Sequence, residues 1–242
     1  METTSVIAKK QSAFKNGLQD GLSIAIGYLP VAITFGLLSK STGLSLGETV
    51  LMSILVYAGA AQYISLNLIA LGTSPIAIII TTFIVNIRHF LMTASLNEKV
   101  EKDHPLIKAL YAFGITDETF SVAATKEGKM SSSYMFGLTL IAYGSWVINS
   151  GIGHFVGQSL PEVLRESMAI ALYAMFIGLL VPSLKRQRKI IILAGFAAIL
   201  NSIFSYIIPP EWSGWAIVSA TLLSAIGIEL LLKIGGSKDV NG

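Results

Sequence analysis

The stretch Ser74–Leu96, SPIAIIITTFIVNIRHFLMTASL, decides which kind of protein this chain forms. About 20 mostly apolar residues are enough for an α-helix to cross the hydrocarbon core of a bilayer. Its second half nevertheless carries Asn86, Arg88 and His89. At a rise of about 1.5 Å per residue, Arg88 would lie only about 4 Å from the middle of the helix. A charge at that depth costs about 2.5–3.5 kcal/mol, so we expect Arg88 to face protein or water and to have a partner.

The composition of the whole chain indicates a membrane protein. Of its 242 residues, 53% are hydrophobic and only 13% are charged, against about 25% charged residues in ordinary soluble domains. The apolar runs are continuous rather than alternating, which argues against a transmembrane β-barrel. We therefore predict an all-α, polytopic integral membrane protein with a single transmembrane transporter domain over residues 1–242.

Several classes of chemistry find no support in the sequence. The chain has no cysteine, so it can form no disulfide, iron–sulfur or thiolate–zinc site. No P-loop, no HExxH motif and no serine–histidine pair is present, so we expect no ATPase or other enzymatic activity, no metal site and no bound cofactor. The net charge of +3 is typical of basic loops that set membrane topology, and we expect no nucleic-acid partner.

About eight transmembrane helices are predicted, with some of them broken. Their expected ranges are Gly17–Leu38, Gly47–Leu71, Pro75–Leu96, Leu106–Thr125, Tyr134–Gly157, Val163–Pro182, Lys189–Ile208 and Gly214–Lys233. Seven helices are the alternative, because Leu106–Thr125 carries charged residues that a hydropathy plot penalises. Both alternatives place the C-terminus in the cytoplasm by the distribution of basic residues, and they differ on the side of the N-terminus.

An internal repeat of four plus four helices favours eight. Gly21-Leu22-Ser23 aligns with Gly137-Leu138-Thr139, and Tyr57-Ala58 aligns with Tyr173-Ala174 at the same offset. The repeats would cover residues 17–125 and 134–233. Many transporters are built from such repeats. Four crossings in each half would make the repeats parallel, whereas an unrecognised re-entrant segment would make them inverted.

Asp117 and Glu118 are the natural partners of Arg88. The third and fourth predicted helices are joined by a short loop, so we expect them to pack side by side. Asp117 and Arg88 would then differ in depth by about 6 Å, which an arginine side chain can reach. One carboxylate is a candidate proton or substrate site, with Arg88 holding a carboxylate group. A purely structural ion pair is the alternative.

Two neighbours of Arg88 are further candidates. Asn86 could contact a ligand or could join helices by a hydrogen bond. Histidine is the side chain that ordinarily titrates near neutral pH, so His89 could take part in a proton relay, although a satisfied core histidine is the commoner case.

Two other stretches predict broken helices. Gly59–Gln62 places small residues around one amide, and Pro30 removes a backbone hydrogen bond from the first helix. The freed backbone groups of broken helices line substrate cavities in transporters. The alternatives are close helix packing at Gly59 and a simple kink at Pro30.

Taken together, these motifs resemble the AzlC family, the large subunits of branched-chain amino acid exporters. The likeness extends from about Gly17 to Ile228. It rests on Gly27-x-x-Pro30 with Phe35-Gly36, on Tyr57-Ala58-Gly59-Ala60-Ala61-Gln62, on Asn86-x-Arg88-His89-x-Leu91-Met92 and on Thr116-Asp117-Glu118.

The resemblance implies a secondary transporter in the bacterial cytoplasmic membrane that exports leucine, isoleucine and valine. It further implies proton coupling and a small membrane partner of the AzlD type, without an ATPase subunit. Two rival functions remain: an uncoupled uniporter or channel for small zwitterions, and an accessory membrane protein whose polar cluster is structural.

Overall fold

The computed structural model describes the backbone of residues 2–156 and 188–209, with side chains from residues 12 and 190 onward. It also describes positions 159, 161–163, 167, 170, 177, 181, 219–220, 222–228 and 230. The predicted helices Val163–Pro182 and Gly214–Lys233 lie largely outside the described residues, so the second half of the predicted repeat is not shown.

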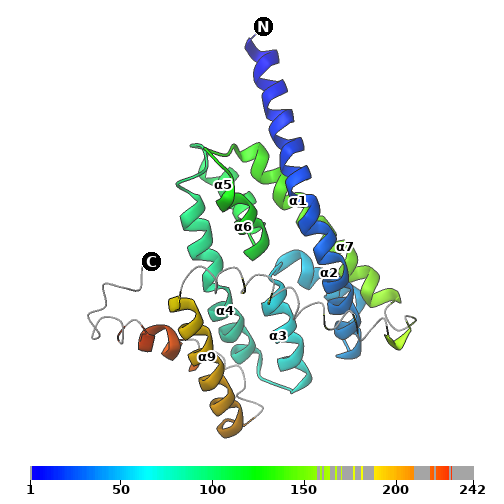
Figure 1. The fold of residues 1–242 in the computed structure, drawn as a ribbon. Coiled ribbons are helices and arrows are strands. Elements are labelled where there is room, and N and C mark those ends of the chain that lie inside the picture. The colour runs from blue at the N-terminus through cyan, green and yellow to red at the C-terminus, as the bar shows by residue number, and fades with distance from the viewer. Residues whose placement is uncertain are drawn as a thin grey trace. The chain divides into compact units, whose positions relative to one another are not determined.

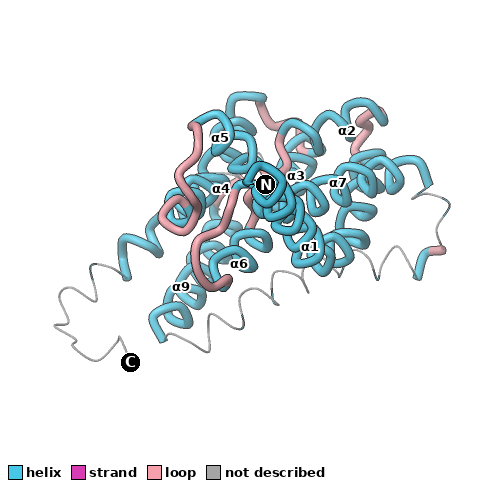
Figure 2. The backbone as a smooth tube through the Cα atoms, turned by 90° about the horizontal axis from the view of Figure 1, so that it is seen from above, coloured by secondary structure: helices cyan, strands magenta, loops and turns pink. Residues whose placement is uncertain are grey.

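All named elements of the described residues are α-helices (Figures 1 and 2). They are α1 Glu2–Ser41, α2 Leu46–Leu55, α3 Gly59–Ala70, α4 Pro75–Leu96, α5 Pro105–Phe113, α6 Asp117–Thr125, α7 Ser132–Val156 and α9 Arg188–Ile207. Within these residues, α1, α4, α7 and α9 contain segments long and apolar enough to cross a membrane. The chain is therefore a multi-pass membrane protein.

The chain forms two compact units, which are described separately. The first consists of Met1–Gln62 and Asn86–Tyr173, and the second of Tyr63–Val85 and Ala174–Gly242. In the second unit, a Cβ atom on Gly227 would lie 3.3 Å from the ring of Phe196, so Gly227 lies close to α9.

The first unit is built on the close, parallel packing of α1 and α7 (Figures 1 and 2). A Cβ atom on Gly17 would overlap the carbonyl oxygen of Tyr134, and one on Gly153 would overlap that of Ile33. The contacts therefore advance in the same direction along both helices. Only glycine permits backbones to approach this closely, as in small-residue interfaces of membrane helices.

The predicted break at Pro30 is wrong, because α1 continues through this residue as one helix. A proline inside a helix costs about 3 kcal/mol through its missing N–H group and its ring. Packing of α1 along α7 offsets this cost. The Thr34 hydroxyl donates a hydrogen bond to the Pro30 carbonyl oxygen at 2.9 Å, which gives that carbonyl group a side-chain partner within the next turn.

The second predicted helix is a hairpin of two short helices. α2 runs antiparallel to α7, since Thr49 bonds to His154 near the end of α7 and the carbonyl group of Ile54 accepts a bond from Tyr143. The chain then turns back, because Gln62 in the first turn of α3 donates a hydrogen bond to Ser53 on α2. The predicted break is confirmed, and the expected crossing is replaced by a fold-back (Figure 1).

The fourth predicted helix is also two helices, and the expectation of one continuous crossing is wrong. α5 follows the direction of α7, because the rings of Tyr111 and Phe113 meet those of Phe136 and Tyr143. α6 runs back toward the start of α1, so the chain reverses its direction between α5 and α6, at Gly114–Thr116.

The direction of α6 follows from two contacts with α1. Glu118 at its start bonds to Tyr28, whereas Lys126 at its end pairs with Asp20, about two turns earlier in α1. A β-bridge between Val100 and Met130 joins the segments that precede and follow this hairpin. The hairpin therefore begins and ends on the same side of the first unit.

The two hairpins enter from opposite sides. α4 runs antiparallel to α5, with Asn97 beside Lys108. The α2–α3 hairpin begins where α1 ends, and the α5–α6 hairpin begins where α4 ends (Figure 1). The turns Val56–Ala58 and Gly114–Thr116, here called the hairpin tips, meet inside the first unit.

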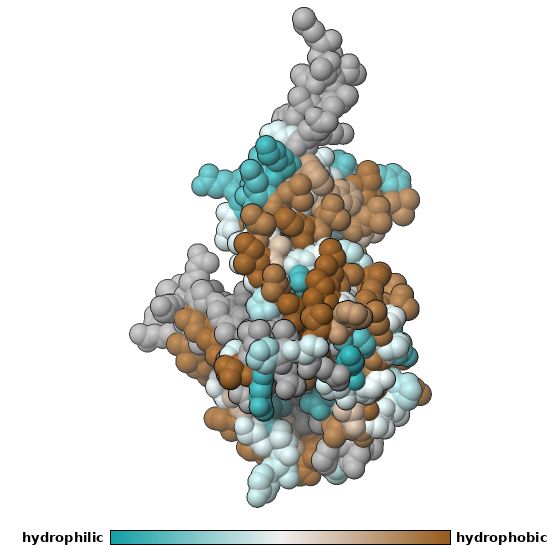
Figure 3. Space-filling model, turned by 90° about the vertical axis from the view of Figure 1, so that its right-hand side faces the viewer, coloured by the Kyte–Doolittle hydropathy of each residue, from teal (hydrophilic) through white to brown (hydrophobic). Residues whose placement is uncertain are grey.

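One face of α4 is suited to contact lipid. Its exposed large apolar side chains recur every three or four residues, which places them on one face of the helix. They are Ile76, Ile79, Phe83, Ile87, Phe90 and Leu91. Hydrophobic side chains also cover much of the face shown in Figure 3.

Candidate functional site

Aromatic rings bring the two hairpin tips together at the middle of α7. Tyr57, at the α2–α3 tip, lies with its ring centroid 6.2 Å from that of Phe113 and 4.9 Å from that of Tyr143. Tyr57 has a φ of 42°, a left-handed conformation that is unusual for a bulky residue. Its hydroxyl oxygen is buried and has no hydrogen-bond partner among the described residues.

Gln62 fixes the α2–α3 tip to α7. This side chain is fully buried. Its amide group donates to the Ser53 hydroxyl at 3.2 Å and accepts from the Trp146 indole N–H at 2.9 Å. A Cβ atom on Gly59 would lie 3.0 Å from the Trp146 ring, so a larger residue there would press against it. The two predicted site residues of this stretch thus lie at the tip, in contact with Trp146.

The α5–α6 tip is held by a capping box. Thr116 is the N-cap of α6, and it exchanges side-chain to backbone hydrogen bonds with Thr119. Such caps satisfy backbone donors that a helix start leaves open. At Gly114 a Cβ atom would lie 2.5 Å from the Cβ of Thr139 on α7, so glycine is required for this approach.

Tyr28 joins this second tip to the first. Its hydroxyl group donates a hydrogen bond to a carboxylate oxygen of Glu118 at 2.5 Å and lies 2.7 Å from the Thr116 hydroxyl. Its ring stands edge-on to Trp146, with centroids 5.2 Å apart. We call Tyr28, Tyr57, Thr116, Glu118 and Trp146 the tip cluster. Residues of α1, α7 and both hairpins therefore converge here.

Arg88 forms the ion pair that its position in an apolar helix predicted. A guanidinium nitrogen lies 3.0 Å from a carboxylate oxygen of Asp117, the first residue of α6. The Arg88 Nε and the Asn86 amide oxygen are buried without a hydrogen-bond partner among the described residues. These two polar atoms on α4 could form hydrogen bonds with a small ligand or water.

His89 and Pro30 are the remaining two predicted site residues. His89 is half-buried on α4, within electrostatic range of Arg88 and Glu118. Pro30 lies two residues beyond Tyr28 inside the continuous α1. Whether either residue contacts a ligand stays a prediction.

The helix ends give the site a mixed polarity. α3 and α6 both begin at the hairpin tips, whereas α2 and α5 both end there. Helix starts carry partial positive charge and helix ends partial negative charge. In transporters, discontinuous helices place such ends against the charged groups of a substrate. The helix ends therefore place partial charges of both signs at the hairpin tips.

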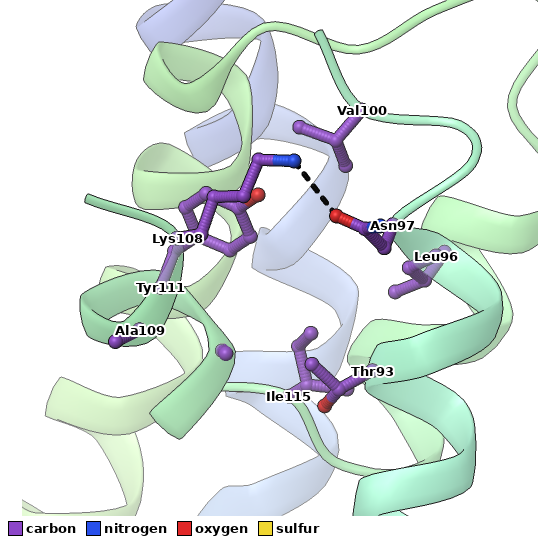
Figure 4. Close-up of a pocket in the computed structure, with 9 residues that line it drawn as sticks. Thr93, Leu96, Asn97, Val100, Lys108, Ala109, Tyr111 and Ile115 are labelled. Atoms are coloured by element: carbon purple, nitrogen blue, oxygen red, sulfur yellow. Dashed lines mark hydrogen bonds between the residues drawn. The ribbon is translucent and has the colours of Figure 1, made fainter. Parts of the chain in front are cut away.

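A cavity of about 190 Å³ lies between the end of α4 and α5 (Figure 4). Its wall is mostly apolar, and the hydrogen bond from Lys108 to Asn97 crosses its polar end. Thr93 lines the cavity from α4, the helix that carries Arg88, and Ile115 lines it from the α5–α6 tip. Among the described residues no cluster of side chains suits a metal ion.

Sequence reasoning gave no role to Trp146 or Tyr143. Both lie in the middle of an apolar helix, away from the membrane interfaces where such residues usually gather. A buried tryptophan or tyrosine needs a partner for its polar atom, and here the partners are Gln62 and the carbonyl group of Ile54. The position of Trp146 and Tyr143 in the middle of an apolar helix could therefore have indicated the site.

Comparisons with known proteins give a consistent result. Residues 23–160 match the model of the family described as "AzlC protein". The chain is 31% identical to the inner membrane protein YgaZ of Escherichia coli over 84% of this chain and 86% of that protein. It is 26% identical to the branched-chain amino acid transport protein AzlC of Bacillus subtilis, over 74% of this chain and 70% of the relative. No solved structure matches the chain significantly.

Proposed function

The chain belongs to the AzlC family, and from this premise we propose that it is a secondary transporter subunit that exports branched-chain amino acids. A relative named for branched-chain amino acid transport supports the substrate class. Export, proton coupling and a small partner of the AzlD type follow from the family resemblance. The location proposed is the bacterial cytoplasmic membrane, in agreement with the inner-membrane relative.

The observation that carries the proposal is the meeting of two hairpin tips beside the Arg88–Asp117 pair. An amino acid brings a carboxylate and an ammonium group. Arg88 and the starts of α3 and α6 suit the carboxylate, and Asp117, Glu118 and the ends of α2 and α5 suit the ammonium group. Asn86, Gly59 and Gln62 would shape the polar end of the site.

The aliphatic side chain of the substrate needs an apolar surface. Phe113 and Tyr143 beside the tips, and the apolar wall of the cavity at Ile115, supply such surfaces. A leucine, isoleucine or valine side chain gains about 0.8 kcal/mol per buried CH₂ group. The site therefore combines charged groups for the amino acid backbone with apolar walls for its side chain.

The test is transport of labelled leucine in proteoliposomes that hold the chain and its small membrane partner, with and without an imposed pH gradient. Arg88→Gln leaves Asp117 without its partner, and we expect flux to fall about 100-fold, because truncating one member of a bonded charge pair costs about 2–5 kcal/mol. Ile87→Ala is the matched control, since Ile87 is the neighbour of Arg88 on the exposed face.

Each result of this experiment has a definite meaning. Gradient-driven flux that Arg88→Gln abolishes and Ile87→Ala retains supports the proposal. Equal flux with and without the gradient would favour a uniporter. Absence of leucine, isoleucine and valine flux in the wild type would contradict the substrate class, and undiminished flux in Arg88→Gln would contradict the site.

A further inference from the structure

Two adjacent carboxylates at the start of α6 have different surroundings. Asp117 is paired with Arg88 at 3.0 Å. Glu118 instead accepts a hydrogen bond from the neutral Tyr28 hydroxyl group at 2.5 Å. Among the described residues, no lysine or arginine lies within ion-pair distance of Glu118. The negative charge of Asp117 is therefore compensated by a cation, whereas that of Glu118 is held by the Tyr28 hydroxyl group and the helix start.

Titratable groups approach Glu118 from three directions. Tyr28 faces it from α1, the Tyr57 hydroxyl lies within its electrostatic range from the α2–α3 tip, and His89 does so from α4. Its chain neighbour Asp117 engages Arg88. Protonation of Glu118 removes a negative charge that has no cationic partner, while protonation of Asp117 would leave Arg88 uncompensated. Glu118 is thus the carboxylate that can change its charge without breaking an ion pair.

A continuous series of side-chain contacts leads from Glu118 to the other hairpin. Tyr28 bonds to Glu118 and meets the Trp146 ring. Trp146 donates to Gln62, and Gln62 donates to Ser53 on α2. An ionised Glu118 accepts the Tyr28 hydrogen bond strongly, because charge-assisted bonds are about twice as strong as neutral ones. A protonated Glu118 accepts it only weakly, so the proton changes how firmly the α5–α6 tip is tied to this series.

We infer that Glu118, rather than Asp117, takes up the proton that is coupled to transport, and that Tyr28 transmits its protonation state to the α2–α3 tip through Trp146 and Gln62. The inference rests on the proposed function. The proton comes from water on one side of the membrane, binds to a Glu118 carboxylate oxygen and returns to water on the other side. No covalent bond of the substrate is made or broken.

The test compares Glu118→Gln with Asp117→Asn in proteoliposomes that contain the small partner. Glutamine keeps a hydrogen-bonding group in place of the carboxylate and cannot carry a proton. We expect the loss of gradient-driven leucine flux in Glu118→Gln to exceed the loss of leucine–leucine exchange at equal pH by at least about tenfold. Asp117→Asn should lower both, because it removes the partner of Arg88.

Leucine binding by the purified protein gives a second readout. Wild-type affinity should change with pH, and that of Glu118→Gln should not. Tyr28→Phe should retain pH-dependent binding, because the Glu118 carboxyl group is still present, but should lose gradient-driven flux. A variant that merely fails to fold would bind no leucine at all.

The outcomes separate the two proposals. A wild type without any flux of branched-chain amino acids overturns the proposed function. Gradient-driven flux in the wild type that survives in Glu118→Gln, or pH-dependent binding that survives in it, overturns this inference alone.

Discussion

The α2–α3 and α5–α6 hairpins both consist of two short helices, but only the second carries charged residues beside its turn. Both reverse direction beside the middle of α7, where Tyr57 of one tip and Phe113 beside the other contact Tyr143. The α2–α3 tip has no charged residue and is tied down by the fully buried Gln62. The α5–α6 tip is followed directly by Asp117 and Glu118. One hairpin thus presents an uncharged tip, and the other presents two carboxyl groups.

The largest expected effect comes from removing the amide that fixes the uncharged tip. Gln62→Leu leaves the Trp146 N–H and the Ser53 hydroxyl unsatisfied. Each unpaired buried group costs about 1–3 kcal/mol. We expect the variant to unfold at clearly lower temperature in detergent, and thermal unfolding followed by size-exclusion chromatography measures this.

The control for this prediction removes the second partner as well. Trp146→Phe also removes part of a buried ring, which costs stability by itself, so its cost is measured both in the wild type and in Gln62→Leu. The cost should be smaller in Gln62→Leu, where the indole donor is already unsatisfied. An equal cost in both backgrounds would show that the amide does not act through Trp146.

An intermediate effect is expected at the cap of the charged tip. Thr116→Val removes the side-chain acceptor for the Thr119 N–H and the contact with Tyr28. Loss of an N-cap costs about 0.5–2 kcal/mol. Thermal unfolding should show this loss, and Thr116→Ser should restore it. Equal stability of both variants would mean that the cap does not hold the α5–α6 tip.

The smallest effect on stability is expected for Tyr57→Phe. The hydroxyl group that it removes is buried without a described partner, so its loss should leave the free energy of unfolding unchanged or raise it by up to about 1 kcal/mol. Leucine flux should nevertheless fall if the hydroxyl group faces the substrate. Flux and unfolding are measured on the same preparation, and a marked loss of stability would contradict the prediction.

The helix α4, the partner of Arg88 and the break near Gln62 could be predicted from the sequence. The bounds of α4 agree with the predicted helix, and a charge inside an apolar stretch correctly implied the partner found in Asp117. The small residues around Gln62 correctly indicated a break. These features are local, because each follows from a polar or small residue in an apolar run.

The rest depended on contacts between distant segments. Hydropathy does not distinguish one crossing helix from two short helices of nine residues each, so the reversal at Gly114–Thr116 was missed. At Pro30 the expectation that proline breaks a helix was wrong, because packing against α7 keeps α1 continuous. Trp146 joins Gln62 across 84 positions of sequence, and no local pattern specifies that pairing.

The backbone contact between α1 and α7 has a consequence for how motion can be observed. At Gly36 and Gly153 a methyl group would already collide with the facing backbone, so these helices have no side-chain layer there that could slide or repack. They form a stationary reference within the first unit. Because the chain contains no cysteine, a spin label on an exposed position of this reference and a second label near either hairpin would report the displacement of that hairpin alone.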